Sequence, residues 1–284
     1  MALDYSINYK AENDYQNSVD EAHWQFLIVP EQNSTQQLLS VDFRNSLGLE
    51  KSYSINGFGF RTIRLHATKK FGKISFEASF KLIKKDINPF DFDAFPAVEE
   101  EYQYIKTLDF QVDFEPFLKT TRFTRLPEAH LPGFQLDQSI SLFENLQQLN
   151  EWTFKFLNFE TGVTDVNTEL DEVIRNRKGV CQDFTHLFCA LARQNGVPVR
   201  YVSGYLHQGN GYFGDSQMHA WAEAFMPSAG WIGFDPTNNL LVNSNYIKVS
   251  HGKDYRDCSP LKGVVYSEGA NETKYSVEVS AQQQ

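Results

Sequence analysis

The first third of the chain alternates hydrophobic and polar positions with a period of two. Tyr5, Ile7 and Tyr9 occupy every second position, and residues 73–81 repeat the alternation. This period is typical of half-buried β-strands, and turn-rich pieces separate the alternating runs. We therefore predict a β-sandwich over residues 1–105, in front of the rest of the chain.

Helical spacing replaces this alternation in the middle of the chain. Apolar residues in 141–159 recur every three or four positions, which predicts a helix with one buried face. A second helix is expected over residues 181–195, ending before Gly196. We predict an α+β domain over residues 106–267 and a loosely attached polar tail over residues 268–284. The strands expected after the second helix are residues 197–205, 219–226 and 231–235.

Composition and charge limit the classes of function. The 284 residues are 41% hydrophobic and carry a formal net charge of −10. Nucleic-acid-binding proteins concentrate Lys and Arg to replace counterions on phosphates, and the sequence has no such cluster. No run of about 18 apolar residues occurs, so no membrane span is expected. We expect neither a nucleic acid nor a membrane as a partner.

The cysteines and the first residues favour a cytoplasmic location. Cys181, Cys189 and Cys258 are an odd and sparse set, which argues against a disulfide framework and for a reducing compartment. The first ten residues, MALDYSINYK, lack a basic segment followed by an apolar one, so we expect no signal peptide.

The segment GVCQDF (179–184) carries the first candidate for chemistry. It places Cys181 at the start of the second predicted helix, where the first amide groups have no acceptor within the helix. The positive end of the helix dipole stabilises a thiolate at this position. Gly179 lets the backbone approach closely, and the amide of Cys181 is a candidate donor to an oxyanion. Cys181 is therefore the candidate nucleophile.

A thiol nucleophile needs a base, and His219 is the best placed of the 7 histidines. His219 begins the predicted strand MHAWAE (218–223), which fixes the direction of its ring. His186 lies on the helix of Cys181 but about 140° around its axis. Asp235 ends the next strand, where its carboxylate is a candidate to orient the imidazole.

The turn between these two strands allows a sharp test. A two-residue turn at Ser228 and Ala229 would put Asp235 opposite Ala222, on the face away from His219. Side chains change face with each one-residue shift of register. A His219–Asp235 pair therefore requires a loop of odd length or a bulge.

These motifs together resemble the transglutaminase-like superfamily, and most of all its bacterial branch of candidate cysteine proteases. The segments that carry the resemblance are GVCQDF (179–184), GVPVRYVSGY (196–205), MHAWAE (218–223), GWIGFDPT (230–237) and HGKDYRDCSPLKGV (251–264). The resemblance implies a papain-like catalytic core, with a helix packed on an antiparallel sheet, behind a β-rich domain. It also implies that Cys181, His219 and Asp235 are the nucleophile, the base and the orienting acid.

The implied chemistry is acyl transfer from a peptide or protein amide through a thioester. Water as the acceptor makes the enzyme a cysteine peptidase or amidase, whereas an amine makes it a transglutaminase. A binding module that uses the fold without turnover is the third possibility, and an intact triad argues against it. Cys189 and Cys258 are expected to be structural thiols. No cofactor and no metal are expected, because neither C-x-x-C nor H-E-x-x-H spacing occurs.

Overall fold

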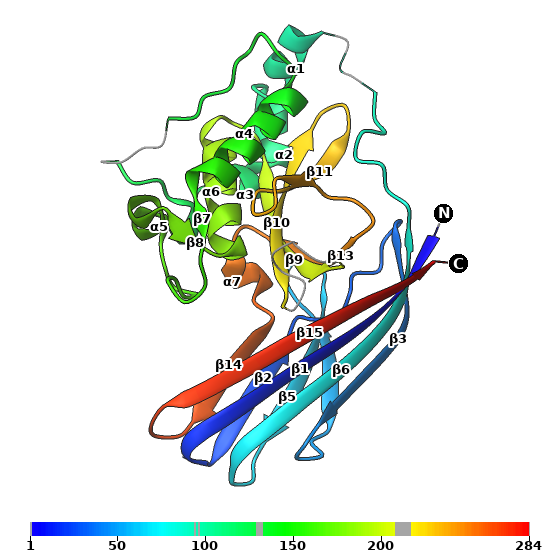
Figure 1. The fold of residues 1–284 in the computed structure, drawn as a ribbon, viewed down its shortest axis with the longest axis vertical. Helices are drawn as coiled ribbons and strands as arrows, with labels where there is room; N and C mark the ends of the chain where they lie inside the picture. Colours follow the sequence, from blue (N-terminus) through cyan, green and yellow to red (C-terminus); the bar gives the residue numbers. More distant parts are fainter. Residues whose placement is uncertain (1, 94, 96, 129–132, 208–216, 284) are drawn as a thin grey trace.

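The computed structural model describes residues 2–93, 95, 97–128, 133–207 and 217–283. A β-sandwich lies beside a second region in which helices cover one sheet (Figure 1). Both ends of the chain lie close together at one edge of the sandwich in this view.

The sandwich consists of two antiparallel four-stranded sheets, one in the order β15-β1-β6-β3 and the other in the order β14-β2-β5-β4. Alternate side chains of β1 and β6 point into its core, so the period of two found in the sequence is confirmed. Aromatic rings fill the core, with Phe26 and Trp24 in edge contact with Phe76 at centroid distances of 4.7 and 5.5 Å. The strands are β1 (Ala2–Val19), β2 (Glu21–Phe26), β3 (Gln36–Asn45), β4 (Lys51–Ile55), β5 (Arg61–Ala67), β6 (Phe71–Lys85), β14 (Leu261–Tyr266) and β15 (Asn271–Gln283).

The loosely attached tail expected over residues 268–284 is a wrong prediction. Strand β15 pairs with β1 from Tyr15↔Asn271 to Leu3↔Gln283, and β14 pairs with β2. Both ends of the chain therefore build the sandwich. The sequence did carry a signal for β15, since Tyr275, Val277, Val279 and Ala281 alternate with polar residues, but the strand lies at the edge of its sheet with most of its side chains exposed and its polar composition was given more weight. The boundaries at residues 105 and 267 stay predictions as domain limits.

The second region contains a five-stranded sheet in the order β12-β11-β10-β9-β13. The predicted strands after residue 196 appear as β9, β10 and β11, and the two predicted helices appear as α4 and α6. The strands are β9 (Val199–Leu206), β10 (His219–Met226), β11 (Gly230–Asp235), β12 (Leu240–Leu241) and β13 (Tyr246–Gly252), with the short parallel pair β7 (Asn158–Phe159) and β8 (Lys178–Gly179) outside this sheet. The helices are α1 (Val98–Tyr104), α2 (Leu108–Asp113), α3 (Glu115–Leu118), α4 (Leu142–Phe156), α5 (Leu170–Asn176), α6 (Cys181–Gln194) and α7 (Tyr255–Cys258), with a 3-10 turn at Arg122–Thr124.

A capping box in the sequence determines where α4 begins, whereas α6 is held in place mainly by burial. The hydroxyl of Ser141 accepts from the Glu144 amide at 3.2 Å, and the Glu144 carboxylate accepts from the Ser141 amide at 3.0 Å. This reciprocal capping satisfies two amides at the helix start. Helix α6 is buried along almost its whole length and packs against β10, β9 and α4. It therefore forms the centre of the second core.

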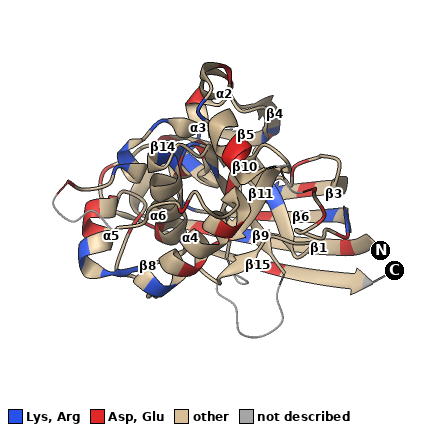
Figure 2. Ribbon diagram, turned by 90° about the horizontal axis from the view of Figure 1, so that it is seen from above, with Lys and Arg blue, Asp and Glu red and all other residues tan. Residues whose placement is uncertain are grey.

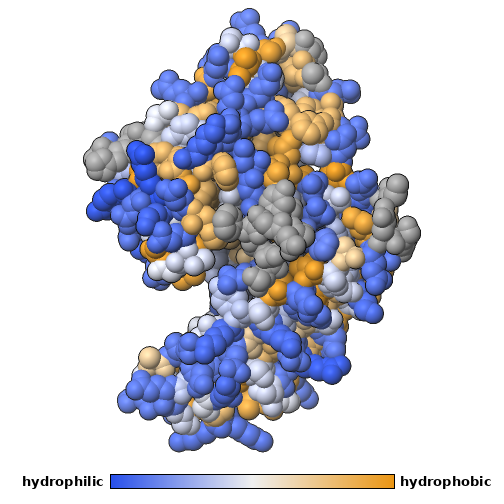
Figure 3. Space-filling view, in the orientation of Figure 1, coloured by the Kyte–Doolittle hydropathy of each residue, from blue (hydrophilic) through white to orange (hydrophobic). Residues whose placement is uncertain are grey.

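One face of the five-stranded sheet joins the hydrophobic core of the sandwich, which is separate from the core around α6. Tyr205 of β9 and Ile247 and Val249 of β13 are buried among the sandwich residues. The Tyr205 hydroxyl donates to the Ile28 carbonyl at 2.6 Å. In the space-filling view a notch separates the two lobes on one side only (Figure 3). No helix in the described ranges is long and apolar enough to cross a membrane.

Strand β15 is expected to be required for the stability of the sandwich. Val277 is 6% exposed and faces the same core as Tyr9, its partner on β1. Val277→Asp buries an unpaired charge and should lower the free energy of unfolding by at least about 2 kcal/mol. Denaturant unfolding measures this loss. Thr273→Asp, at an exposed position of the same strand, is the control, and equal stability of the two variants would contradict the role of β15.

Candidate active site

Cys181 is the first residue of α6, and the turn before it is held by Asp183. The Asp183 carboxylate accepts from the Val180 amide at 2.8 Å and from the Thr164 hydroxyl at 2.7 Å. Burial raises the pKa of Asp183 to about 6 against the opposing effect of these hydrogen bonds. A Cβ at position 179 would lie 2.6 Å from the Asp183 carboxylate, so only glycine fits beside it. The partly exposed Cys181 thiol is thus presented at the helix start.

The hairpin between β10 and β11 has the odd loop length that a His–Asp pair requires. Its last pair is Met226↔Gly230, which leaves three residues, 227–229, in the loop. The Ala229 amide closes a turn on the Met226 carbonyl, and Gly230 follows with a left-handed φ of 74°. In this register Phe234 lies opposite Ala222, so Asp235 falls on the same face as His219. The prediction of an odd loop is confirmed.

His219 and Asp235 form a hydrogen-bonded pair inside the protein. Nε2 of His219 lies 2.8 Å from Oδ2 of Asp235, and both side chains are fully buried. The other ring nitrogen, Nδ1, is buried and has no hydrogen-bond partner among the described residues. The side of the ring away from Asp235 is therefore available to accept a proton.

Four further groups donate to the carboxylate of Asp235. Oδ1 accepts from the backbone amides of Thr237 and Asn238 at 3.0 and 3.3 Å, and Oδ2 accepts from the Asn238 side chain and the Tyr246 hydroxyl, each at 2.8 Å. These donors were not expected from the sequence. The run Asp-Pro-Thr-Asn is a turn in which an Asp side chain accepts amides two and three residues ahead, so a signal for Thr237 and Asn238 was present. Tyr246 comes from β13 and had none.

The buried pair shifts the pKa values of its members in opposite directions. Burial alone would lower the pKa of His219, but the charge and hydrogen bond of Asp235 raise it above the ordinary value of 6.5. Negative charge on Cys181 raises it further. Burial alone would raise the pKa of Asp235, and His219, Asn238 and Tyr246 lower it. The arrangement therefore favours an imidazolium beside a carboxylate, with the thiol as a second partner.

Tyrosines from three elements lie within electrostatic reach of the Cys181 thiol. Burial raises the pKa of Tyr201, Tyr255 and Tyr275, and negative charge on Cys181 raises each of them further. Tyr201 belongs to β9 and Tyr255 to α7, whereas Tyr275 belongs to β15 of the sandwich. Tyr275 is 51% exposed. The effect of charge on Cys181 therefore extends to a strand of the sandwich.

The other cysteines and His186 are buried. Cys189 and Cys258 are buried, and burial raises the pKa of both thiols, to about 11 for Cys189. Nε2 of His186 accepts the Tyr255 amide at 3.1 Å, and its ring stacks on Phe123. Burial and the charge of Arg193 lower the pKa of His186 to about 3, so this ring stays neutral.

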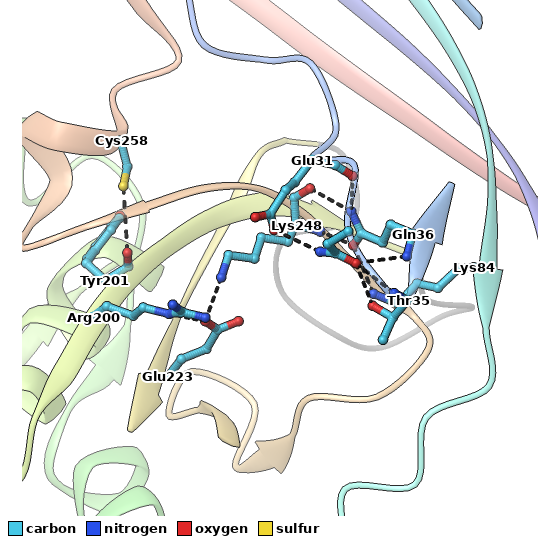
Figure 4. Close-up of polar contacts among 10 residues, drawn as sticks. Glu31, Thr35, Gln36, Lys84, Arg200, Tyr201, Glu223, Lys248 and Cys258 are labelled. Carbon is cyan, nitrogen blue, oxygen red and sulfur yellow. Dashed lines mark hydrogen bonds and ion pairs between the residues drawn. The ribbon is translucent and has the colours of Figure 1, made fainter. Parts of the chain in front are cut away.

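Strand β13, which supplies Tyr246, is fastened to the sandwich by polar contacts (Figure 4). The Gln36 side chain accepts from the Lys248 amide at 2.7 Å and donates to the Lys248 carbonyl at 2.9 Å. The buried ammonium of Lys84 donates to Gln36 at 2.9 Å and also to the Tyr246 carbonyl. These contacts set the position of the Tyr246 backbone.

Ion pairs connect three strands of the five-stranded sheet. Glu223 of β10 accepts from Arg200 of β9 at 2.5 Å and from Lys248 of β13 at 2.7 Å (Figure 4). Burial would raise the pKa of Glu223, but the two cations lower it to about 2. Elsewhere acidic and basic residues are interspersed, as on α5, which carries both signs (Figure 2). Within the described ranges, the one group of three converging metal-ligand side chains lies on the sandwich and away from this sheet.

Part of the chain is similar in sequence to known proteins. The sequence model of the transglutaminase-like superfamily matches residues 135–236, the segment that holds Cys181, His219 and Asp235. An uncharacterised protein of Mycobacterium leprae is 38% identical over 133 residues, which are 45% of this chain and 47% of that protein. A protein-glutamine gamma-glutamyltransferase of Pseudomonas aeruginosa is 30% identical over 98 residues, which are 32% of this chain and 14% of that protein.

A solved structure extends the comparison to the whole chain. A candidate cysteine protease from Cytophaga hutchinsonii has a TM-score of 0.79 and 21% identity, covering 100% of this chain and 92% of that chain. At this identity the likeness concerns the fold, and the predicted α+β fold with its β-rich N-terminal region is confirmed. The chain spans about half the length of the curated mycobacterial relatives it matches.

Replacement of Gly179 should disturb the turn that presents Cys181. The new Cβ of Gly179→Ala would lie 2.6 Å from the Asp183 carboxylate oxygen and 2.7 Å from its Cβ. We expect the free energy of unfolding to fall by about 1–3 kcal/mol, as for other overpacked sites. Gly72→Ala is the matched control, since its Cβ would meet nothing within 4 Å. Equal stability of the two variants would refute the close packing at position 179.

The charge of Asp235 should keep the pKa of His219 high. Asp235→Asn removes that charge while the ring stays buried, so the pKa of His219 should fall. Ring nitrogen chemical shifts of His219, followed by NMR against pH, measure it. Because the wild-type pKa is higher in the folded chain than in the unfolded one, protonation of His219 stabilises the fold.

The same shift predicts how stability depends on pH. The contribution of His219 is fully present below the unfolded pKa of about 6.5 and disappears as pH rises through the folded pKa. The difference in unfolding free energy between wild type and Asp235→Asn should therefore become smaller as the pH rises through the folded pKa of His219. An unchanged titration of His219 in Asp235→Asn would contradict the assigned cause.

Proposed function

We propose, from the premise that the chain contains a transglutaminase-like domain, that it is a thiol-dependent acyl-transfer enzyme. The observation that carries the proposal is the buried His219–Asp235 pair, whose free ring nitrogen is available to the Cys181 thiol. In this proposal Cys181 is the nucleophile, His219 is the base and then the acid, and Asp235 orients and charges the imidazole.

The first half of the reaction cleaves an amide. The Cys181 sulfur attacks the carbonyl carbon after its proton passes to Nδ1 of His219. The negative charge that forms on the carbonyl oxygen faces the start of α6, where the first amides have no acceptor within the helix. Collapse of this intermediate breaks the carbon–nitrogen bond. The departing amine takes the proton from His219, and the acyl group remains on sulfur as a thioester.

The second half of the reaction releases the acyl group. Water, deprotonated by His219, attacks the thioester to give a carboxylic acid and restores the thiol. Because the Cys181 side chain is partly exposed, water has a route to the thioester. We therefore favour hydrolysis of peptide or isopeptide-type amides, the activity of a cysteine peptidase or amidase.

Transfer to an amine is the second candidate. The partial similarity to a protein-glutamine gamma-glutamyltransferase favours it, since the matched segment lies within the same type of domain. In that reaction a lysine-type amine replaces water, and an isopeptide bond replaces the acid. In both candidates the partner is a peptide or protein that offers an amide. The three free cysteines fit our further proposal of a cytoplasmic location.

Mass spectrometry of the native protein treated with iodoacetamide tests the nucleophile first. Cys181 should be alkylated at least about tenfold faster than Cys189 and Cys258, because those thiols are buried and their pKa values are raised. His219→Gln should slow the labelling of Cys181 and leave the two buried cysteines unchanged. Equal labelling of all three cysteines would favour a binding module without turnover.

Product analysis then separates the two reactions. Glutamine-containing peptides are incubated with and without a primary amine, and released ammonia and product mass are measured. Hydrolysis adds water to the acyl product whether or not the amine is present, whereas transfer adds the amine. Cys181→Ser should lower either activity by at least about a thousandfold. Cys189→Ser, eight residues along the same helix, is the control, and activity that survives in Cys181→Ser would refute the mechanism.

A further inference from the structure

We propose that Glu21, His23 and His66 form a binding site for a first-row transition-metal cation such as Zn²⁺. The three residues lie on the sandwich, in strand β2 and at the end of strand β5. They are separate from the five-stranded sheet that carries His219 and Asp235. The site is therefore a new one, independent of the proposed acyl-transfer chemistry.

The alternation of β2 places its polar residues on one face. Ala22, Trp24 and Phe26 are buried in the sandwich, whereas Glu21 and His23 point outward. In the chain His23 and His66 are 43 positions apart, so no metal-binding spacing is visible in the sequence. The sheet removes this separation, because His23 pairs directly with His66 across the β2–β5 ladder.

The two imidazoles lie face to face. Their ring centroids are 3.8 Å apart and their planes differ by 14°, so the rings stack. The pairing of the two strands thus brings one nitrogen of each imidazole to the same spot on the sheet surface, and imidazole nitrogen is the commonest metal ligand in proteins.

Glu21 completes a set of three ligand atoms. Its Oε1 lies 2.7 Å from Nε2 of His66 and 3.4 Å from Nε2 of His23. All three ligand atoms lie within 4.8 Å of one another. Tetrahedral zinc with bonds of about 2.0–2.1 Å holds its nitrogen and oxygen ligands about 3.3 Å apart. Because the ring planes are nearly parallel, the exposed side chains must rotate so that their nitrogen lone pairs converge on one cation.

The donor types determine which cations fit. Two imidazoles and one carboxylate suit Zn²⁺, Ni²⁺, Cu²⁺ and Fe²⁺, whereas Mg²⁺ and Ca²⁺ require mainly oxygen ligands. Each of the three side chains is about half exposed. A bound cation would therefore keep at least one position open to water, so the cation should exchange readily.

Calorimetric titration of the full chain with Zn²⁺ tests the site. The parent carries Cys181→Ser, so that the partly exposed thiol cannot bind zinc in its place. We expect one Zn²⁺ per chain, and His23→Gln and His66→Gln should each weaken binding at least about tenfold. Glu77→Gln removes an exposed carboxylate from the opposite sheet and should leave affinity unchanged. Excess Mg²⁺ should not displace the zinc.

A second readout keeps the test independent of stability. In the folded parent the ring signals of His23 and His66 should move together in NMR spectra as Zn²⁺ is added, while those of His186 stay fixed. Circular dichroism establishes that each variant is folded. Zinc that binds with equal affinity to the parent and to both histidine variants would overturn the proposal. Absence of binding at millimolar Zn²⁺ would overturn it as well.

Discussion

The burial of the Asp235 carboxylate is the constraint on which the arrangement of the site depends. A charge that is fully removed from water is tolerated only when it is paired and hydrogen-bonded. Asp235 meets this requirement with five donated hydrogen bonds, from His219, Thr237, Asn238 and Tyr246. These donors come from β10, from the turn after β11 and from β13. The carboxylate therefore fixes the order and register of the sheet as well as the orientation of the imidazole.

This constraint reaches into the sandwich through β13. Gln36 and Lys84 hold the backbone of β13 where Tyr246 and Lys248 lie, and both come from sandwich strands. Lys84 is itself buried, and desolvation lowers its pKa to about 8. Its hydrogen bonds therefore help to stabilise the buried ammonium group. Two buried charges, the Asp235 carboxylate and the Lys84 ammonium, thus depend on contacts of β13, which lies between the sandwich and the site.

Much of the site could be predicted from the sequence because its chemistry leaves local signals. Cys181 follows a glycine at a helix start, and His219 and Asp235 stand on strands whose hairpin needed an odd loop. Tyr246 gave no such signal, since its role arises only when β13 joins the far edge of the sheet and its hydroxyl reaches the Asp235 carboxylate. Strand β15 was missed for a different reason. It is an edge strand with most of its side chains exposed, and the alternation of Tyr275, Val277, Val279 and Ala281 with polar residues was outweighed by its polar composition.

The position of β15 bears on the role of the sandwich at the candidate site. Tyr275 comes from this strand, and negative charge on Cys181 raises its pKa, so the thiol is electrostatically coupled to the sandwich. The strand is one edge of the sheet whose strands β3 and β6 carry Gln36 and Lys84, the residues that hold β13. The sheet that holds β13 in place therefore also carries a side chain that is coupled to the thiol. Removal of the sandwich would remove both contributions together, so point substitutions of exposed side chains such as Tyr275 are needed to separate an effect on the thiol from an effect on assembly.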